Sequence, residues 1–430
     1  MIRTTLMGTV SGLFLLGGAL AGGGASVASP PPVPHSNQHL PNVTVSTSRS
    51  FLPNMHTSKP PVVRAPSPLD AAAFSDPVPL QALAMRTAQD GWAIGRDALL
   101  ATTDGGRQWH TVTPPHVTIH DPGNARTGWF LADFGVAWDF VGPHSAWVAT
   151  TISNRSGAFL LGHTTDSGKR WTQTRIQLPL TAYAWRGSQA LQVDFVNNRM
   201  GWLAVGPGAS GPQFPMELWQ TANAGQSWHR VFATEAFGGA FAFTSPQDGW
   251  LLFQAPANNG ILFALRHTTT AGRSWRTVPV PNLPGFANYM NGSAGTGLTW
   301  RGVDGALAGS TMQFGASQGY LAVLRTTDNG RQWAVSPQIS AHSGMFVGVA
   351  TAGASAWAVA DGHLYTLSRQ HQSWTLRTAA PWLAQATGLD AVNRGVTFIW
   401  QTTKRRTQIW RTTDGGVHWI AVDPTQVANS

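Results

Sequence analysis

The chain has 430 residues, no cysteine and a formal net charge of +9 at pH 7. The absence of cysteine excludes disulfides, thiolate metal sites and a cysteine nucleophile. Only 11% of the residues are charged, whereas glycine (47), proline (28) and tryptophan (20) are abundant, which favours many short strands joined by tight turns over long amphipathic helices.

The first 28 residues have the pattern of an export signal. Arg3 precedes a short apolar stretch from Leu6 to Ala21, and small residues follow up to Ser26-Val27-Ala28. Signal peptidase accepts this arrangement. An uncleaved anchor is the alternative, but the stretch is short and glycine-rich for a bilayer span, which needs about 20 apolar residues. We therefore expect a secreted protein at the cell exterior, with no integral membrane span after signal cleavage.

Residues 29–79 are rich in proline and serine, as in Pro30-Pro31-Pro32-Val33-Pro34. Proline at this density prevents helix formation and removes hydrogen-bond donors, so we expect a disordered linker.

Residues 80–430 contain an eight-residue motif that repeats along the chain. Its form is Thr-x-Asp-x-Gly-x-x-Trp, and four copies are complete. They place Asp104, Gly106 and Trp109; Asp166, Gly168 and Trp171; Asp328, Gly330 and Trp333; and Asp414, Gly416 and Trp419. Three further copies are eroded, and they keep Asn223, Gly225 and Trp228; Thr270, Gly272 and Trp275; and Trp374 alone.

The residue types of the motif predict a tight turn between two strands. We expect the aspartate to accept hydrogen bonds from backbone N–H groups two residues further on, and the glycine to supply a positive φ. The tryptophan then opens the next strand and covers the turn. Asn223 keeps the acceptor oxygen and Thr270 keeps a weaker one, so both of those copies are expected to fold.

A second repeated piece precedes the turns and supplies the other strands of each repeat. Gly91-Trp92-Ala93-Ile94-Gly95 is one copy, and Val193-Asp194-Phe195 is an example of the strand before it. Four strands per repeat of about 49 residues match the blade of a β-propeller. We predict an all-β fold of seven four-stranded antiparallel blades, in which Asp121–Phe140 is an insertion. Six or eight blades are the alternatives.

Gly91–Gly95 followed by Thr102–Trp109 resembles the repeat of the photosystem II assembly and stability factor family, which pairs a Gly-Trp strand with an Asp-Gly-Gly turn. More broadly, the motif is similar to the Asp-box, or bacterial neuraminidase repeat, of sialidases, xyloglucan-cleaving hydrolases and sortilin-type receptors. The resemblance covers roughly residues 80–422. It implies a propeller of the sialidase-like superfamily and, from the photosystem factors, an assembly role without catalysis, although fold does not determine function.

Three kinds of chemistry were weighed against that role. A sialidase needs a tyrosine nucleophile with a glutamate partner, but the chain has four tyrosines and only two glutamates, Glu217 and Glu235. A glycoside hydrolase needs two facing carboxylates, for which Asp121, Asp133 or Asp139 could meet Asp194, Asp304 or Asp390. A metal would need a third ligand beside His116 and His120.

Binding is the function that we favour from the sequence, with a two-carboxylate hydrolase as the alternative. We expect a protein or cell-surface glycan as partner, no cofactor, no metal and a monomer. Nucleic acid is not expected, because the basic residues are scattered. Candidate contacts are the loops Pro207–Phe214, Ala255–Gly260 and Asn288–Gly297, and the arginines Arg186, Arg199 and Arg301. The excess of arginine over carboxylates also suits an acidic exterior.

Overall fold

A computed structural model of the chain describes residues 76–95, 97–117, 136–152, 157–180, 189–207, 216–234, 238–257, 260–281, 298–301, 304–312, 318–342, 346–370, 373–403 and 406–427. All of these residues belong to one compact unit. The predicted signal peptide lies outside this part of the chain, and so does the predicted linker except for its last four residues.

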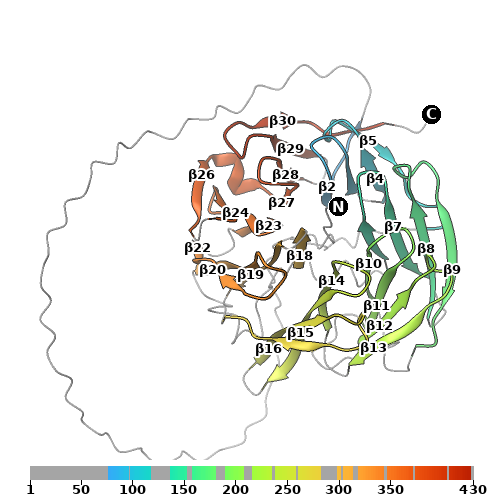
Figure 1. Cartoon of the computed structure of the whole chain (residues 1–430). Coiled ribbons are helices and arrows are strands. Elements are labelled where there is room, and N and C mark those ends of the chain that lie inside the picture. Colours follow the sequence, from blue (N-terminus) through green and yellow to red (C-terminus); the bar gives the residue numbers. More distant parts are fainter. Residues whose placement is uncertain are drawn as a thin grey trace, which may run out of the picture. The chain divides into compact units, whose positions relative to one another are not determined.

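Seven sheets, each built on four consecutive antiparallel strands, stand as blades around a ring (Figure 1). The first three blades are β2 (Ala82–Met85), β3 (Gly91–Ile94), β4 (Leu99–Thr102) and β5 (Gln108–Thr111); β6 (Val136–Phe140), β7 (Ala146–Thr151), β8 (Ala158–Thr164) and β9 (Thr172–Gln177); and β10 (Gln189–Phe195), β11 (Gly201–Pro207), β12 (Met216–Thr221) and β13 (His229–Thr234).

The remaining four blades repeat this order. They are β14 (Gly238–Phe243), β15 (Gly249–Ala257), β16 (Gly260–Thr268) and β17 (Arg276–Val278); β18 (Leu298–Arg301), β19 (Asp304–Met312), β20 (Gln318–Thr326) and β21 (Ala334–Val335), with β22 (Ile339–His342) also on β20; β23 (Phe346–Ala352), β24 (Ser355–Ala360), β25 (His363–Leu367) and β26 (Thr375–Ala379); and β27 (Gly388–Ala391), β28 (Thr397–Thr402), β29 (Thr407–Thr412) and β30 (Ile420–Val422). The predicted seven-bladed propeller is confirmed.

The first strand of each blade is the innermost, and these strands contact one another around the ring. β6 contacts β10, β10 contacts β14, and the series continues through β18, β23 and β27 to β2. The one helical segment in the described residues is a short 3-10 turn, η2 (Pro381–Gln385), after β26. Within the same residues, no helix has the length and apolar character that crossing a membrane requires.

The predicted insertion at Asp121–Phe140 is wrong at its end. Val136–Phe140 is β6, the innermost strand of the second blade, and its residues are buried; residues 121–135 lie outside the described part. Of the predicted loop Ala255–Gly260, Ala255–Ala257 belong to β15 and Gly260 belongs to β16, and these residues pair with the facing strand of the hairpin. The predicted loop at Asn288–Gly297 lies outside the described residues, as does Pro207–Phe214 after its first residue.

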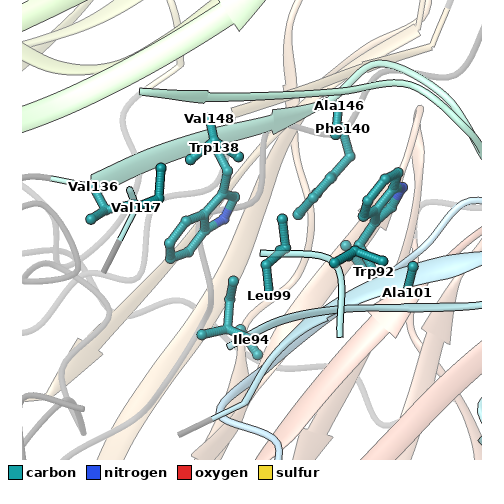
Figure 2. Packing of buried hydrophobic residues seen from close by; sticks show 13 residues of the cluster. Trp92, Ile94, Leu99, Ala101, Val117, Val136, Trp138, Phe140, Ala146 and Val148 are labelled. Carbon is teal, nitrogen blue, oxygen red and sulfur yellow. The ribbon is translucent and has the colours of Figure 1, made fainter. Parts of the chain in front are cut away.

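The tryptophan of each Gly-Trp strand packs between two blades. The Trp92 ring stacks on Phe140 of the next blade at 5.2 Å (Figure 2). The same arrangement recurs in Trp147 with Phe195 at 3.7 Å, Trp202 with Phe243 at 3.5 Å and Trp250 with Trp300 at 4.8 Å. Stacked aromatic pairs add about 0.5–1.5 kcal/mol beyond the area they bury, so these tryptophans hold neighbouring blades together.

The glycine before the tryptophan makes room for the partner ring within its own blade. Gly201 pairs directly with Phe195, and a Cβ on Gly201 would lie 2.4 Å from the phenyl ring. Gly249 stands in the same relation to Phe243, at 2.5 Å. The Gly-Trp dipeptide therefore serves two contacts, since the glycine admits the ring of its own innermost strand and the tryptophan covers the ring of the next blade.

Both ends of the described chain close the ring. β31 (Thr425–Val427) pairs in parallel with β5, the outer strand of the first blade, and β1 (Asp76–Pro77) pairs with β31. Leu80, just before the first blade, bonds to the last blade: its backbone N–H donates to Thr407 Oγ1 and its carbonyl accepts from Thr402 Oγ1, both at 2.6 Å. Each blade forms its four strands from one continuous stretch of chain. The segments at the two ends of the described chain connect the last blade to the first.

Candidate functional site

The repeated turns join the third and fourth strands of six blades, and their polar side chains bond within the turn. In the first turn Thr102 Oγ1 accepts from the Gly106 N–H at 3.1 Å and donates to Asp104 at 2.9 Å. Asp104 Oδ1 accepts from the N–H groups of Arg107 and Gln108, each at 3.0 Å. These donors lie three and four residues after the aspartate, so the prediction that the donors lie two residues after it was wrong.

The other turns repeat this geometry with different acceptors. Asp166, Asp328 and Asp414 accept from the residue four positions on at 2.9–3.0 Å, as do Asn223 and Thr270 at 2.9 Å. Gly168, Gly225, Gly272, Gly330 and Gly416 each have a positive φ and donate to the first threonine. These polar groups stabilise the turns.

Two of these aspartates have strong local partners. The Arg170 guanidinium lies 2.8 Å from Asp166 and holds the pKa of that carboxyl down at about 2. Partial burial opposes ionisation of Asp414, but the backbone and ring of His418 outweigh it and lower the pKa of the carboxyl to about 2. Neither carboxyl is poised to act as an acid or base near neutral pH.

The turn tryptophans also bond through their indole N–H groups. Trp109, Trp228, Trp275 and Trp419 donate to the glycine carbonyl of their own turn at 2.9–3.3 Å. Trp171 and Trp374 instead donate to Val112 and Pro337 of the preceding blade. Trp333 packs edge-on against Trp250. Six of the seven indole N–H groups therefore bond backbone carbonyls, whereas Trp333 contributes packing and its buried Nε1 has no hydrogen-bond partner.

Three aspartates on innermost strands join neighbouring blades. Asp139 accepts from the Phe195 N–H of the third blade at 2.6 Å, and Asp194 accepts from the Phe243 N–H of the fourth at 2.5 Å. Asp390 of the last blade accepts from the Met85 N–H of the first at 2.6 Å. All three are buried. The sequence suggested these residues as catalytic carboxylates, but the structure uses each of them as an acceptor for the backbone of the next blade.

The last of these contacts contains a buried ionic cluster at the ring closure. Arg86, only 4% exposed, follows β2, and the charges of Asp390 and Asp139 both act on its guanidinium. Burial raises the pKa of Asp390 to about 6, although Arg86 and the Met85 N–H both act to lower it. Burial also lowers the pKa of Arg86, and the two carboxylates oppose that shift.

A cavity of about 970 Å³ lies where three innermost strands end. Its lining comes from the turn after β2, the turn between β6 and β7, and the turn between β10 and β11, with one residue from the third repeated turn. The residues are Arg86 and Thr87; Val141, Gly142, Pro143 and Ser145; Asn197, Asn198, Arg199 and Met200; and Ala222. Two guanidinium groups, two amides and two hydroxyls lie in this lining, and no carboxylate does.

A smaller cavity of about 460 Å³ lies between the sixth and seventh blades. Arg377, Arg394 and Asp414 are among its lining residues. Arg377 donates to Thr366 Oγ1 at 2.9 Å and Asp414 is bonded to His418.

The remaining candidates from the sequence do not form a catalytic centre in the described residues. Asp304 lies 3.0 Å from Arg369, and buried Glu217 bonds Arg230 at 3.2 Å and the Trp219 indole at 3.1 Å. No group of three His, Asp or Glu side chains in this part of the chain is arranged to hold a metal. Outside the described residues lie Asp121, Asp133, His120, Glu235 and Arg186.

Arg199 is the one predicted contact residue that the structure places in the larger cavity. The other lining residues of this cavity were not predicted, because the three turns that carry them share no sequence motif. The signal that could have found them is positional: each of the three turns directly follows an innermost strand, and in a propeller those strand ends gather near one another.

No protein-family profile matches the chain, and no curated protein matches it. Solved structures match most of the chain at low identity. "YCF48 bound to D1 peptide" shares 14% identity over 83% of this chain and 99% of that one, with a TM-score of 0.42. An oligogalacturonate lyase from Vibrio parahaemolyticus shares 8% over 79% and 90%, with a TM-score of 0.47. A Fusarium graminearum α-L-arabinofuranosidase shares 10% over 67% and 91%, with a TM-score of 0.38. They include a peptide-bound protein and two enzymes, so these similarities assign no function.

Proposed function

We propose that the chain is exported, loses residues 1–28, and acts at the cell exterior as a non-catalytic propeller that binds a protein or glycan partner, in the manner of a scaffold or assembly factor. The cavity at the ends of β2, β6 and β10 carries this proposal. Its volume of about 970 Å³ lies at the upper end of the range of ligand sites, about 300–1,000 Å³.

The chemistry of the lining suits recognition. Arg86 and Arg199 offer guanidinium donors that match carboxylate, sulfate or phosphate groups, and Asn197 and Asn198 offer amides. A glycoside hydrolase would need an acid and a second carboxylate about 5–10 Å apart, and the lining supplies neither. Asp139, Asp194 and Asp390 instead accept backbone hydrogen bonds inside the ring.

Binding to isolated cell envelopes of the source cells tests the proposal. The wild type and the double variant Asn198→Ala/Arg199→Ala are mixed with envelopes over a range of protein concentrations, and the sedimented fraction is measured. We expect the double variant to bind at least about tenfold more weakly, as for a contact centre that loses a charged and an amide donor.

The matched control is Arg175→Ala, on the outer strand β9, which removes one exposed arginine far from the cavity lining. It should bind as the wild type does. Equal binding of all three proteins would mean that the cavity does not hold the partner. Export is tested separately: N-terminal sequencing of protein from the culture medium should begin at Ser29.

A further inference from the structure

Arg86 has an unusual position, because it belongs to the cavity lining and to the buried cluster behind it. It lines the cavity with Arg199, while Asp390 of the last blade accepts at 2.6 Å from the N–H of Met85, the residue before Arg86, and the charges of Asp390 and Asp139 act on its guanidinium. A group that enters the cavity therefore experiences the charge of Arg86 together with the charges of both carboxylates.

The net charge of this cluster depends on Asp390. With both carboxylates ionised, Arg86 and the two aspartates sum to −1, and neutralisation of Asp390 brings the sum to zero. Strands β23, β24 and β28 pack around β27, and they carry no titratable side chain. Strand β2 carries none either, so Arg86 is the charged neighbour that Asp390 responds to, with Asp139 beyond it.

We propose that Asp390 is an acid-sensitive gate for anionic ligands, so that protonation of its buried carboxyl strengthens the binding of a carboxylate or sulfate group beside Arg86 and Arg199. The proposal rests on the proposed function, because it concerns the same cavity, and it adds both the chemical class of the ligand and its regulation by pH. The partner would then bind more tightly in an acidic exterior and be released towards neutral pH.

The pH range follows from the burial of Asp390. Desolvation raises the pKa of this carboxyl to about 6, so it is largely ionised at pH 7.5 and largely protonated at pH 5. A protonated carboxyl still has an oxygen that can accept from the Met85 N–H, so the contact between the blades survives the change. The gate therefore changes charge without opening the ring.

The size of the effect follows from Coulomb's law. Two like charges about 10 Å apart in a protein of effective dielectric about 20 repel enough to change a binding constant about tenfold. Linkage requires the reverse effect as well, since an anion that binds better to the protonated form must promote proton uptake when it binds.

Sulfate is a suitable probe, because it keeps its charge at both pH 5 and pH 7.5. Titration calorimetry of the full-length protein with sulfate, at constant ionic strength, should show saturable binding that is about tenfold tighter at pH 5. Asp390→Asn should bind tightly at both pH values and lose the pH dependence. Asp194→Asn alters the equivalent contact between the third and fourth blades and should keep the dependence of the wild type, because Asp194 neither lines the cavity nor is among the carboxylates that act on Arg86.

A second measurement requires no variant. Repeating the wild-type titration near pH 6 in buffers of different ionisation heat gives the number of protons taken up on binding, and the gate predicts a clear fractional uptake. Absence of saturable sulfate binding, equal affinity at the two pH values, or wild-type pH dependence in Asp390→Asn would each overturn the proposal. Sulfate binding that is lost in Arg199→Ala but does not vary with pH would refute the acid-sensitive gate and would be consistent with the proposed function. The proposed function is refuted instead if the cavity variant Asn198→Ala/Arg199→Ala binds envelopes as well as the wild type does.

Discussion

The turn glycines provide a sharp test of how the repeated turns hold neighbouring blades together. Gly330 in the fifth blade has φ +76, and a Cβ at this position would lie 2.0 Å from Cη2 and 2.3 Å from Cζ2 of Trp250 in the fourth blade. Trp250 is fully buried and stacked between His267 and Trp300. Its ring has no room to move, so Gly330→Ala forces either the turn or the interface between the blades to shift.

The expected cost has two parts. A left-handed backbone costs alanine about 1–2 kcal/mol, and overpacking a core costs about 1–3 kcal/mol more. Gly415→Ala isolates the first part, because Gly415 has φ +79 while its nearest neighbour is the Arg394 carbonyl at 3.6 Å. Ala224 and Ala271 occupy the equivalent position in other turns with φ 60. We therefore expect a loss of about 1 kcal/mol for Gly415→Ala and about 2–5 kcal/mol for Gly330→Ala.

Urea unfolding followed by tryptophan fluorescence and by far-ultraviolet circular dichroism measures both variants against the wild type. Agreement of the two probes is needed, since a repeat protein can unfold blade by blade. Equal losses in the two variants would show that packing against Trp250 contributes nothing, and a larger loss in Gly415→Ala would refute the reasoning.

Four further predictions concern contacts between blades and within them. Asp194→Ala leaves the buried Phe243 N–H without its acceptor at 2.5 Å and should lower the free energy of unfolding by about 1–3 kcal/mol, measured in urea; an unchanged midpoint would contradict this. The folded pKa of Asp390 is about 6, above the usual value of 3.8, so its contribution to the free energy of unfolding is fully present below pH 3.8 and is lost as pH rises through 6. When the pH is lowered from 7.5 to 4, the free energy of unfolding of the wild type should therefore rise by up to about 3 kcal/mol relative to that of Asp390→Asn, as measured by thermal unfolding. Asp166 and Asp414, with folded pKa values of about 2, act in the opposite sense: their stabilisation is present above pH 3.8 and is lost as pH falls to 2. Truncation after Asp423 removes β31 and should increase amide exchange in β5, with no such increase in β13, where no added strand pairs.

The sequence predicted the parts of the fold that repeat. The blade count follows from the spacing of the turns, and the role of the tryptophans follows from the two places they share in each blade. The order of strands within a blade, with Val193–Phe195 innermost and the Gly-Trp strand next, is also as predicted.

Features that depend on contacts between distant segments were not predicted. Thr425–Val427 is three residues long with no apolar alternation, so nothing local marks it as the strand that closes the ring. Asp139 and Asp390 resemble turn or edge acids in the sequence, because only the neighbouring blade supplies their donors. The reach of Asp104 was underestimated, since Gly105 and Gly106 both have a positive φ and bring later N–H groups back to the carboxylate.

The cavity was missed for the same reason. Its lining combines turns from three blades whose sequences share no motif, and Arg199 was singled out only for its charge. Arg86 belongs to the cavity lining and interacts with Asp390 because the first and last blades meet at the ring closure. That contact joins residues 305 positions apart in the chain, so the sequence alone does not predict it.

Turnover of a panel of fluorogenic glycosides by the purified protein tests the proposed function, in which the chain binds a partner and catalyses no hydrolysis. We predict no release of fluorophore above the buffer control between pH 4 and 7.5, for the wild type and for Asp139→Asn or Asp194→Asn alike. Clear turnover by the wild type that either of these substitutions abolishes would show that the aspartates of the innermost strands are catalytic, and would contradict the account.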